Sequence, residues 1–278
     1  MGRRRRNDYG SAKAIVILIA IIVGLYFIVW TLSALLAFIT NNSWILYTLL
    51  GLFFVIAGAY LGVEYYKVKK YKETEYYNAT GRPYNELKKP GVKFEATTYN
   101  RLKADFSRAT FLVNVLLPKA DSVNQYFEID IVMFSAKGII LLELKDWKGF
   151  INGSLTSEKW DVGIKKTDGS RMVNKYYNPY KQNKYHIKEL NKIVSYPYKG
   201  YVIFSEAGNI GGGFSNISHY DGFVKAYKNL PVEHVDTNEM NEIYRRLKKS
   251  IITEKIPDHI ERVKYNQSKH ERFTKRRG

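Results

Sequence analysis

Two long apolar segments near the N-terminus limit most strongly what this chain can fold into. Residues 14–39 and 44–63 contain no charged side chain, and only a short polar loop separates them. A helix crosses the hydrocarbon core of a bilayer with about 20 apolar residues, and each segment supplies that length. The first is too long for the apolar region of a cleaved signal peptide, and no small-residue cleavage site follows it. We therefore predict two transmembrane helices rather than two core helices of a soluble protein.

Basic residues flank this pair of segments and are absent from the loop between them. They are Arg3, Arg4, Arg5, Arg6, Lys13, Lys67, Lys69, Lys70 and Lys72. Because lysine and arginine near membrane helices favour the cytoplasmic side, we predict a multi-pass protein of the cell membrane with both termini cytoplasmic. Gly58 and Gly62 have the GxxxG spacing that lets helices approach closely, either against the first helix or in a homodimer.

The rest of the chain divides by composition. Residues 1–13 form a basic N-terminus, and residues 64–91, without sustained periodicity, are interpreted as a juxtamembrane linker. Residues 92–206 show the strand and helix patterns of one α/β domain, placed in the cytoplasm, and residues 207–278 form a helical extension with a basic tail. The net charge of +18 indicates an anionic partner, either nucleic acid or the lipid of the inner leaflet.

The expected elements of residues 92–206 follow one another in a simple order. They are a helix at 92–103, strands at 111–117, 125–134 and 139–147, short strands and turns over 150–174, a helix at 178–194 and a strand at 201–204. Asn178 and Pro179 suit the N-cap and the first position of the second helix. Beyond this domain, residues 208–213 are interpreted as a flexible glycine-rich loop, and residues 238–251 and 257–270 as helices.

The segment from residue 125 to residue 149 places charged side chains inside apolar strands, which is unfavourable without a reason. Its two strands should form an antiparallel hairpin around a tight turn at residues 135–138. If the turn is centred on Ala136 and Lys137, Asp130 lies opposite Glu143. Lys145 then projects from the same face as Glu143, and Glu128 from the same face as Asp130.

Two opposed carboxylates repel each other unless a cation lies between them, so the hairpin predicts a divalent metal held by Asp130 and Glu143. Oxygen ligands in a chain without cysteine favour Mg²⁺ or Mn²⁺ over zinc. The alternative is a surface hairpin with an exposed Glu-Lys pair and an unrelated aspartate. Apolar residues on both faces of the two strands make that alternative the weaker interpretation.

Several separated residues complete a recognisable pattern. In order they are Glu128-Ile129-Asp130, Gly138-Ile139-Ile140, Glu143-Leu144-Lys145-Asp146-Trp147-Lys148-Gly149, Trp160, Asn178-Pro179, Gln182 and His186. This pattern resembles NERD, the nuclease-related domain of the PD-(D/E)xK nuclease superfamily. The resemblance implies an α/β fold with a restriction-endonuclease-like α-β-β-β-α-β core and a mixed sheet, here preceded by a transmembrane helical hairpin.

The resemblance also implies roles for individual residues. Asp130, Glu143 and the backbone carbonyl of Leu144 would hold Mg²⁺ or Mn²⁺, while Lys145 would position or activate the attacking water and stabilise charge on the phosphate. Gln182 and Glu95 would orient water or ligands. Considered alone, Glu95 has a simpler interpretation, as a glutamate that interacts with the helix dipole from near the start of its helix.

The predicted helix at 178–194 carries a stripe of lysines, namely Lys181, Lys184, Lys188 and Lys192. The stripe is either the solvated face of the helix or a surface that follows a phosphate backbone beside Gln182. His186, one turn from Gln182, is either a packed histidine or a contact to metal or substrate. Trp160 is interpreted as a packing residue rather than a base-stacking one.

Together these patterns predict a membrane-anchored, Mg²⁺- or Mn²⁺-dependent nuclease that hydrolyses nucleic acid, with DNA favoured over RNA, on the cytoplasmic side. One alternative is a non-catalytic membrane-tethered module that binds nucleic acid or a protein with the same fold. Another is a membrane-organising protein whose positive charge serves anionic lipid only. Asp130, Glu143 and Lys145 favour the nuclease, because a binding module gains nothing from paired carboxylates that face a polyanion.

Overall fold

The protein is described by a computed structural model that covers residues 8–121, 125–165, 167–232 and 236–252. The chain divides into two compact units, Met1–Lys70 and Tyr71–Gly278. The first contains helix α1 (Asp8–Asn41) and most of helix α2 (Ser43–Lys72). Within them, Ile21–Phe38 and Trp44–Lys72 are long and apolar enough to cross a membrane. Among the described residues of these two segments, Tyr71 alone is buried in the protein. The described chain leaves open space within 4 Å of a Cβ added at Gly58 or Gly62, so the packing predicted there stays a prediction.

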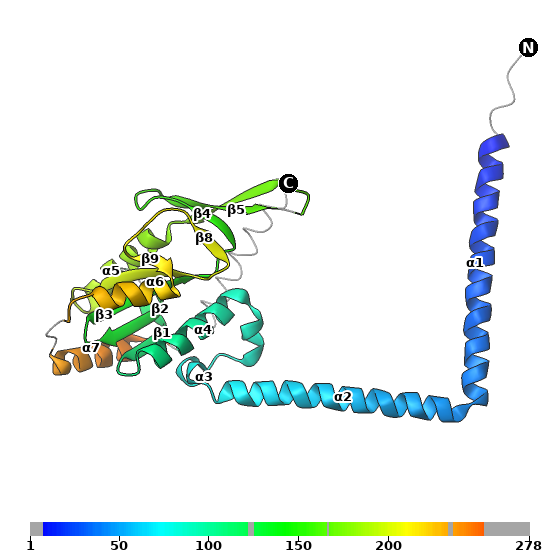
Figure 1. The fold of residues 1–278 in the computed structure, drawn as a ribbon, viewed down its shortest axis with the longest axis horizontal. Helices are drawn as coiled ribbons and strands as arrows, with labels where there is room; N and C mark the ends of the chain where they lie inside the picture. Colours follow the sequence, from blue (N-terminus) through cyan, green and yellow to red (C-terminus); the bar gives the residue numbers. More distant parts are fainter. Residues whose placement is uncertain (1–7, 122–124, 166, 233–235, 253–278) are drawn as a thin grey trace, which may run out of the picture. The chain divides into compact units, whose positions relative to one another are not determined.

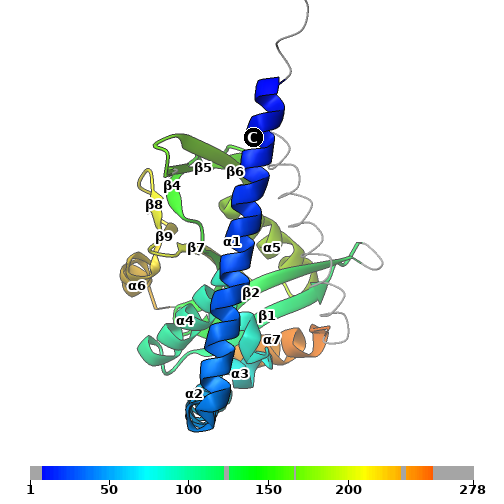
Figure 2. The same ribbon diagram turned by 90° about the vertical axis from the view of Figure 1, so that its right-hand side faces the viewer.

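The second unit is a mixed α/β domain built on two sheets (Figures 1 and 2). The larger sheet has the strand order β1 (Thr110–Pro118), β2 (Tyr126–Ser135), β3 (Gly138–Lys145), β7 (Lys199–Phe204) and β9 (Ile217–His219). Strands β1, β2 and β3 are antiparallel, whereas β7 and β9 run parallel to β3. The smaller sheet has the order β6 (Arg171–Tyr177), β5 (Lys159–Lys165), β4 (Gly149–Asn152) and β8 (Gly208–Ile210).

Helices cover both faces of the larger sheet. One face meets α3 (Glu75–Thr80), the 3₁₀ helix η1 (Tyr84–Lys88), α4 (Pro90–Asp105) and α6 (Tyr220–Asn229), and the other meets α5 (Pro179–Ile193) and α7 (Thr237–Ser250). The alternation of strand side chains explains this layering. Ile131 and Met133 of β2 pack on the first face, whereas Val132 and Phe134 pack on the second. The predicted two-sided burial of the hairpin is therefore confirmed.

The predicted order of elements is also confirmed, since α4, β1, β2, β3, α5 and β7 occur in the order α-β-β-β-α-β, with the short strands β4 to β6 between β3 and α5. The hairpin has the predicted register, with Ile131 opposite Leu142 and Ser135 opposite Gly138. Short strands occupy the region of residues 150–174 as expected, and α7 matches the helix predicted at 238–251. Helix α6 was not expected from the sequence. The helix predicted at 257–270 and the basic tail lie outside the described residues.

Residues 64–91 are not the irregular linker that the sequence suggested, because most of them are helical. α2 continues to Lys72, and α3 and η1 follow it. Tyr71 and Tyr76 are buried in the same core as Tyr99 and Leu102 of α4. Thr74 caps the start of α3 by accepting from the backbone N–H of Tyr77. The six-residue α3 is too short to show a helical period in sequence, so its buried tyrosines looked like part of a polar tract.

The glycine-rich segment at 208–213 also differs from its interpretation as a flexible loop. Residues Gly208–Ile210 form strand β8, which pairs in parallel with β4. A Cβ added at Gly208 would lie 2.7 Å from the carbonyl oxygen of Trp147 and 2.6 Å from Ile151. Glycine is required here for close approach between strands rather than for mobility.

We predict that Tyr76 stabilises the domain although it precedes the α/β pattern in sequence. Its ring is fully buried, and its hydroxyl donates to Glu95 Oε1 at 2.8 Å. Tyr76→Ala should lower the free energy of unfolding by about 3–5 kcal/mol through the cavity it leaves. Tyr76→Phe should lower it by about 1–3 kcal/mol, because only the hydrogen bond to a buried acceptor is lost. Denaturant unfolding checks both values.

Tyr177→Phe is a matched control, because Tyr177 is 47% exposed. Equal stability of Tyr76→Ala and the unsubstituted protein would show that residues 71–89 are not part of the folded domain.

Candidate functional site

One pocket collects most of the predicted site residues. It has a volume of about 380 Å³ and lies between β2, β3 and α5. Its lining includes Glu128, Asp130, Glu143, Leu144, Lys145, Gln182 and His186. Glu95 and the predicted lysine stripe are not among its lining residues. The structure thus brings together side chains that are more than fifty residues apart in the sequence.

The pocket opens where β3 leaves β2. The β2–β3 ladder ends at Ile131 and Leu142, one position before Asp130 and Glu143. Strand β3 continues beside β7, where Glu143 faces Val202 and Lys145 faces Phe204. The Asp130 carboxylate replaces the lost ladder bond by accepting from the backbone N–H of Leu144 at 2.6 Å. Asp130 and Glu143 were expected to lie opposite each other in the ladder, but the ladder ends one position before them. The two strands are joined there by the bond between the Asp130 side chain and the Leu144 backbone.

Glu143 is the most buried charge in the pocket, with 2% of its side chain exposed. Lys145 Nζ donates to Glu143 Oε1, and His186 Nδ1 lies 3.4 Å from Oε2. Burial acts to raise the pKa of Glu143, but Lys145 and His186 outweigh it and hold that pKa below its ordinary value. Burial acts to lower the pKa of Lys145, but Glu143 and Asp130 raise it. Glu143 and Lys145 are therefore a buried ion pair.

Asp130 has the opposite electrostatic situation. Burial raises its pKa well above the ordinary value, and the neighbouring charge of Glu143 raises it further. Lys145 and the Leu144 N–H act in the other direction but do not prevail. The neutral form of Asp130 is therefore more favoured than it is for an exposed aspartate. A divalent cation would reverse that preference, since an adjacent positive charge favours the ionised carboxylate.

The donor set of the pocket fits a hard divalent cation. Asp130 and Glu143 offer carboxylate oxygens, and Mg²⁺ is commonly bound by one or two carboxylates together with water and substrate phosphate. Among the described residues, no group of three or more His, Cys, Asp and Glu side chains could hold a metal ion. Remaining ligands would therefore come from backbone carbonyl, water or substrate oxygens.

Glu95 lies behind the pocket rather than in it. Its Oε1 accepts from Tyr76 Oη at 2.8 Å and from Asn114 Nδ2 at 2.6 Å, and its Oε2 lies 3.6 Å from Arg82. Burial raises the pKa of Glu95, while Arg82 and the two hydrogen bonds oppose the rise. Arg82 also reaches Glu128 Oε1 at 3.6 Å. Arg82 and Asn114 thus connect Glu95 with the rim of the pocket.

Arg82 and Asn114 were not expected from the sequence to support the site. Asn114 interrupts β1 with a φ of 52°, a left-handed conformation that Asn tolerates better than most residues. Its Oδ1 accepts from Arg82 at 3.0 Å while its Nδ2 donates to Glu95. An asparagine inside an apolar strand is the one signal that could have pointed to this position. Arg82 lies in the segment interpreted as a linker and carried no signal.

Helix α5 supplies Gln182 and His186 to the pocket. His186 is buried, and the approach of its Nδ1 to Glu143 Oε2 at 3.4 Å does not meet hydrogen-bond geometry, nor does any other contact of Nδ1 among the described residues. The lysines of α5 differ among themselves. Lys181 lies 3.1 Å from Glu158, and Lys192 lies 2.6 Å from Asp121 and 2.8 Å from Glu189, whereas Lys184 and Lys188 are exposed. The stripe as a phosphate-binding surface stays a prediction.

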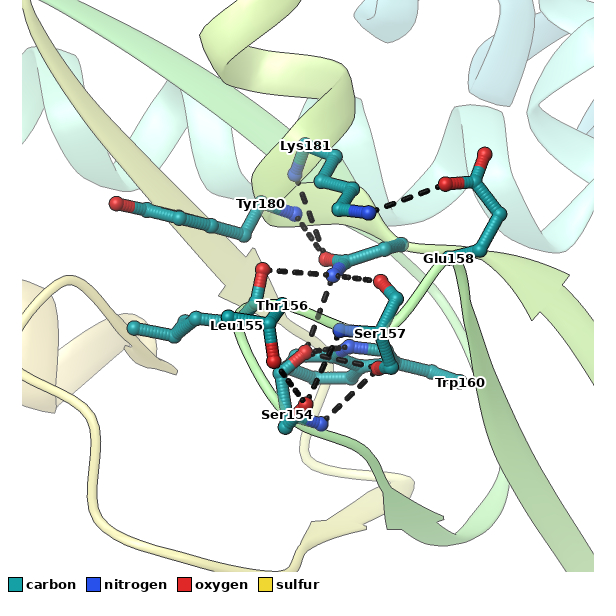
Figure 3. Close-up of polar contacts among 9 residues, drawn as sticks. Ser154, Leu155, Thr156, Ser157, Glu158, Trp160, Tyr180 and Lys181 are labelled. Carbon is teal, nitrogen blue, oxygen red and sulfur yellow. Dashed lines mark hydrogen bonds and ion pairs between the residues drawn. The ribbon is translucent and has the colours of Figure 1, made fainter.

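Asn178 fixes the start of α5. Its Oδ1 accepts from the backbone N–H groups of Tyr180 and Lys181 at 3.0 and 3.4 Å. Its Nδ2 donates to carbonyl oxygens of the loop between β4 and β5, at 3.1 Å for Ser154, 3.3 Å for Leu155 and 2.7 Å for Ser157 (Figure 3). Trp160 Nε1 donates to Ser154 O at 2.9 Å, and the ring is 1% exposed, so Trp160 is a packing residue as predicted.

Comparison with known families agrees with the fold. Residues 90–205, from α4 through β7, match the family model NERD, the nuclease-related domain. The chain therefore carries a nuclease-related domain of the NERD type, which spans less than half of its length. None of the curated proteins and none of the solved structures matches the chain.

We predict that the buried Glu143–Lys145 pair is strongly coupled. Lys145→Met should lower the free energy of unfolding by about 3–5 kcal/mol, because it leaves Glu143 buried without its cation. The double variant Glu143→Gln with Lys145→Met should be clearly more stable than Lys145→Met alone. Denaturant unfolding of the single and double variants in EDTA measures the coupling.

Lys148→Met is a matched control, because Lys148 is exposed three residues further along. Additive effects of the two substitutions would contradict the ion pair.

Proposed function

We propose that this protein is a membrane-anchored, divalent-metal-dependent nuclease that hydrolyses phosphodiester bonds of DNA or RNA on the cytoplasmic side of the cell membrane. The observation that carries the proposal is the convergence of Asp130, Glu143, Lys145 and Gln182 on one pocket of a nuclease-related domain. DNA is the favoured substrate.

Asp130 and Glu143 would hold Mg²⁺ or Mn²⁺, with the Leu144 carbonyl as a further ligand. When bound, the metal would act as a Lewis acid toward the scissile phosphate and lower the pKa of a bound water. The remaining work falls to side chains of this chain. Hydrolysis joins a water oxygen to phosphorus and breaks the P–O bond to the leaving sugar oxygen, with negative charge rising on the phosphate oxygens.

Lys145 is suited to stabilise that charge. Glu143 and Asp130 hold its pKa above the ordinary value, which favours the ammonium form. Its role is therefore to hold a phosphate oxygen or the attacking water by hydrogen bonds. Gln182 lines the same pocket and would orient the water. Glu95 would act indirectly, because both of its oxygens are engaged by Tyr76, Asn114 and Arg82.

We predict metal-dependent cleavage of labelled DNA or RNA by the purified full-length chain. EDTA should abolish cleavage, and Mg²⁺ or Mn²⁺ should restore it. Asp130→Asn and Lys145→Met should each lower kcat by a factor on the order of 100 or more, because charge stabilisation of that size is typical of such groups. Gel analysis of single- and double-stranded substrates measures the cleavage.

Lys148→Met again serves as the control and should retain activity. Binding of nucleic acid without cleavage in any metal, unaltered by Asp130→Asn, would support the binding module instead.

The membrane part of the proposal rests on the apolar helices α1 and α2 and on the basic residues beside them. The absence of cysteine allows single-cysteine labelling. Asn42→Cys, between the helices, should react with a membrane-impermeant maleimide on intact cells. Lys225→Cys, on α6, should react only after lysis. Labelling of Lys225→Cys on intact cells, or protection of Asn42→Cys, would contradict the proposed topology.

A further inference from the structure

The smaller sheet has two unlike faces. On one face Ile151, Trp160 and Val162 are buried and pack against Val202 and Phe204 of the larger sheet. The other face, here called the outer face, carries the alternate residues of the same strands. Three of its apolar side chains are strongly exposed, with 53% for Phe150, 55% for Val173 and 47% for Tyr177. Exposed aromatic side chains on a sheet face offer a contact surface for a partner.

The register of the strands shows what surrounds these side chains. Phe150 faces Gly163, which faces Val173, so these residues form one row across the sheet. The other rows of the outer face pair Asn152 with Asp161 and Lys175, Lys159 with Tyr177, and Lys165 with Arg171. Aromatic and basic side chains therefore alternate over the face. Asp161 is its one acidic residue in these paired rows and lies 3.7 Å from Lys175.

Gly163 leaves the middle of this face without a side chain. A Cβ added there would meet only the Phe150 carbonyl oxygen, at 3.8 Å, which is ordinary contact. Neither close packing nor a left-handed backbone requires glycine at this position. Its effect is to leave the backbone between Phe150 and Val173 uncovered by a side chain. A flat ring could lie on that backbone beside the Phe150 side chain.

The outer face is linked to the candidate site through the chain. Strand β6 ends at Tyr177, the next residue caps α5, and α5 carries Gln182. The Asn178 side chain ties the start of α5 to the β4–β5 loop, so the smaller sheet and the helix are held together (Figure 3). The smaller sheet and the helix that carries Gln182 therefore hold a fixed position relative to each other.

We propose that the outer face binds a single strand of nucleic acid, with bases stacked on Phe150 and Tyr177 and phosphates held by Lys159, Lys165 and Arg171. Exposed aromatic rings beside basic side chains recognise unpaired bases, which a duplex keeps stacked inside. A second copy of this chain is disfavoured as occupant, because its outer face would bring the same positive charge. The inference rests on the proposed function and assigns its substrate to single-stranded nucleic acid.

The test compares binding of labelled single-stranded and double-stranded oligonucleotides by fluorescence anisotropy, with the full-length chain in detergent micelles and EDTA. The double variant Phe150→Ala with Tyr177→Ala should raise the Kd for the single strand on the order of tenfold or more. Gly163→Glu should raise it as well, and more than the isosteric Gly163→Gln. Lys165→Ala with Arg171→Ala should make the affinity less dependent on salt.

Val232→Ala and Lys225→Ala are the matched controls, since both side chains are exposed on other parts of the domain. Thermal unfolding confirms that each variant is folded. A Kd unchanged by both Gly163→Glu and the aromatic double variant would overturn the proposal. Tighter binding of the duplex than of the single strand would also overturn it. So would variants that lose binding to anionic lipid vesicles while their binding of the single strand is unchanged.

Hydrolysis of a small chromogenic phosphodiester separates this inference from the proposed function. The small ester reaches the pocket without the outer face, so Gly163→Glu should leave its hydrolysis unchanged while kcat/KM for single strands falls. Hydrolysis of the ester with unaltered strand binding in Gly163→Glu would overturn the binding face alone. Absence of any hydrolysis, with strand binding lost in Gly163→Glu, would overturn the nuclease and support the binding face.

Discussion

The candidate site depends on how a buried carboxylate is kept charged. Glu143 occupies a strand position that is buried on both sides, where an unpaired charge would be strongly unfavourable. Lys145 compensates it from the same face of β3, and His186 borders its second oxygen. Burial, and after it the charge of Glu143, leaves Asp130 with a raised pKa, which Lys145 opposes without cancelling. A further positive charge in the pocket, such as the proposed divalent metal, would lower the pKa of Asp130 again.

Residues outside the matched family region complete the support of this site. Tyr76 and Arg82 precede residue 90, yet together with Asn114 they engage both oxygens of Glu95. Arg82 lies between Glu95 and Glu128, and its positive charge offsets the negative charge that these two carboxylates add near Asp130. The helical elements α3 and η1, which follow α2, thus contribute core packing and hydrogen bonds to the domain and are not a linker.

The sequence predicted the central hairpin, its register and the helix that faces it, because each depends on local signals: period-2 alternation, a tight turn and an Asn-Pro start. It did not predict α3, whose few residues carry no visible period, or the pairing of β8 with β4, which depends on close approach at Gly208. The contacts of Arg82 with Glu95 and Asn114 join distant parts of the chain, and no local pattern encodes them. Among the site residues, Asp130, Glu143, Lys145 and Gln182 were placed together from spacing and resemblance, whereas the position of Glu95 required the tertiary structure.

The distribution of positive charge separates two surfaces that the net charge of the chain does not distinguish. On α5, Lys181 and Lys192 are already paired with carboxylates, so the charge left for a phosphate backbone is mainly that of Lys184 and Lys188. On the outer face of the smaller sheet, the basic side chains lie beside exposed rings and the backbone left uncovered at Gly163. Charge alone attracts any polyanion, whereas charge combined with accessible aromatic rings selects unpaired bases. Specificity for strand form would therefore arise on the sheet, and the lysines of α5 would add affinity without selecting between strands.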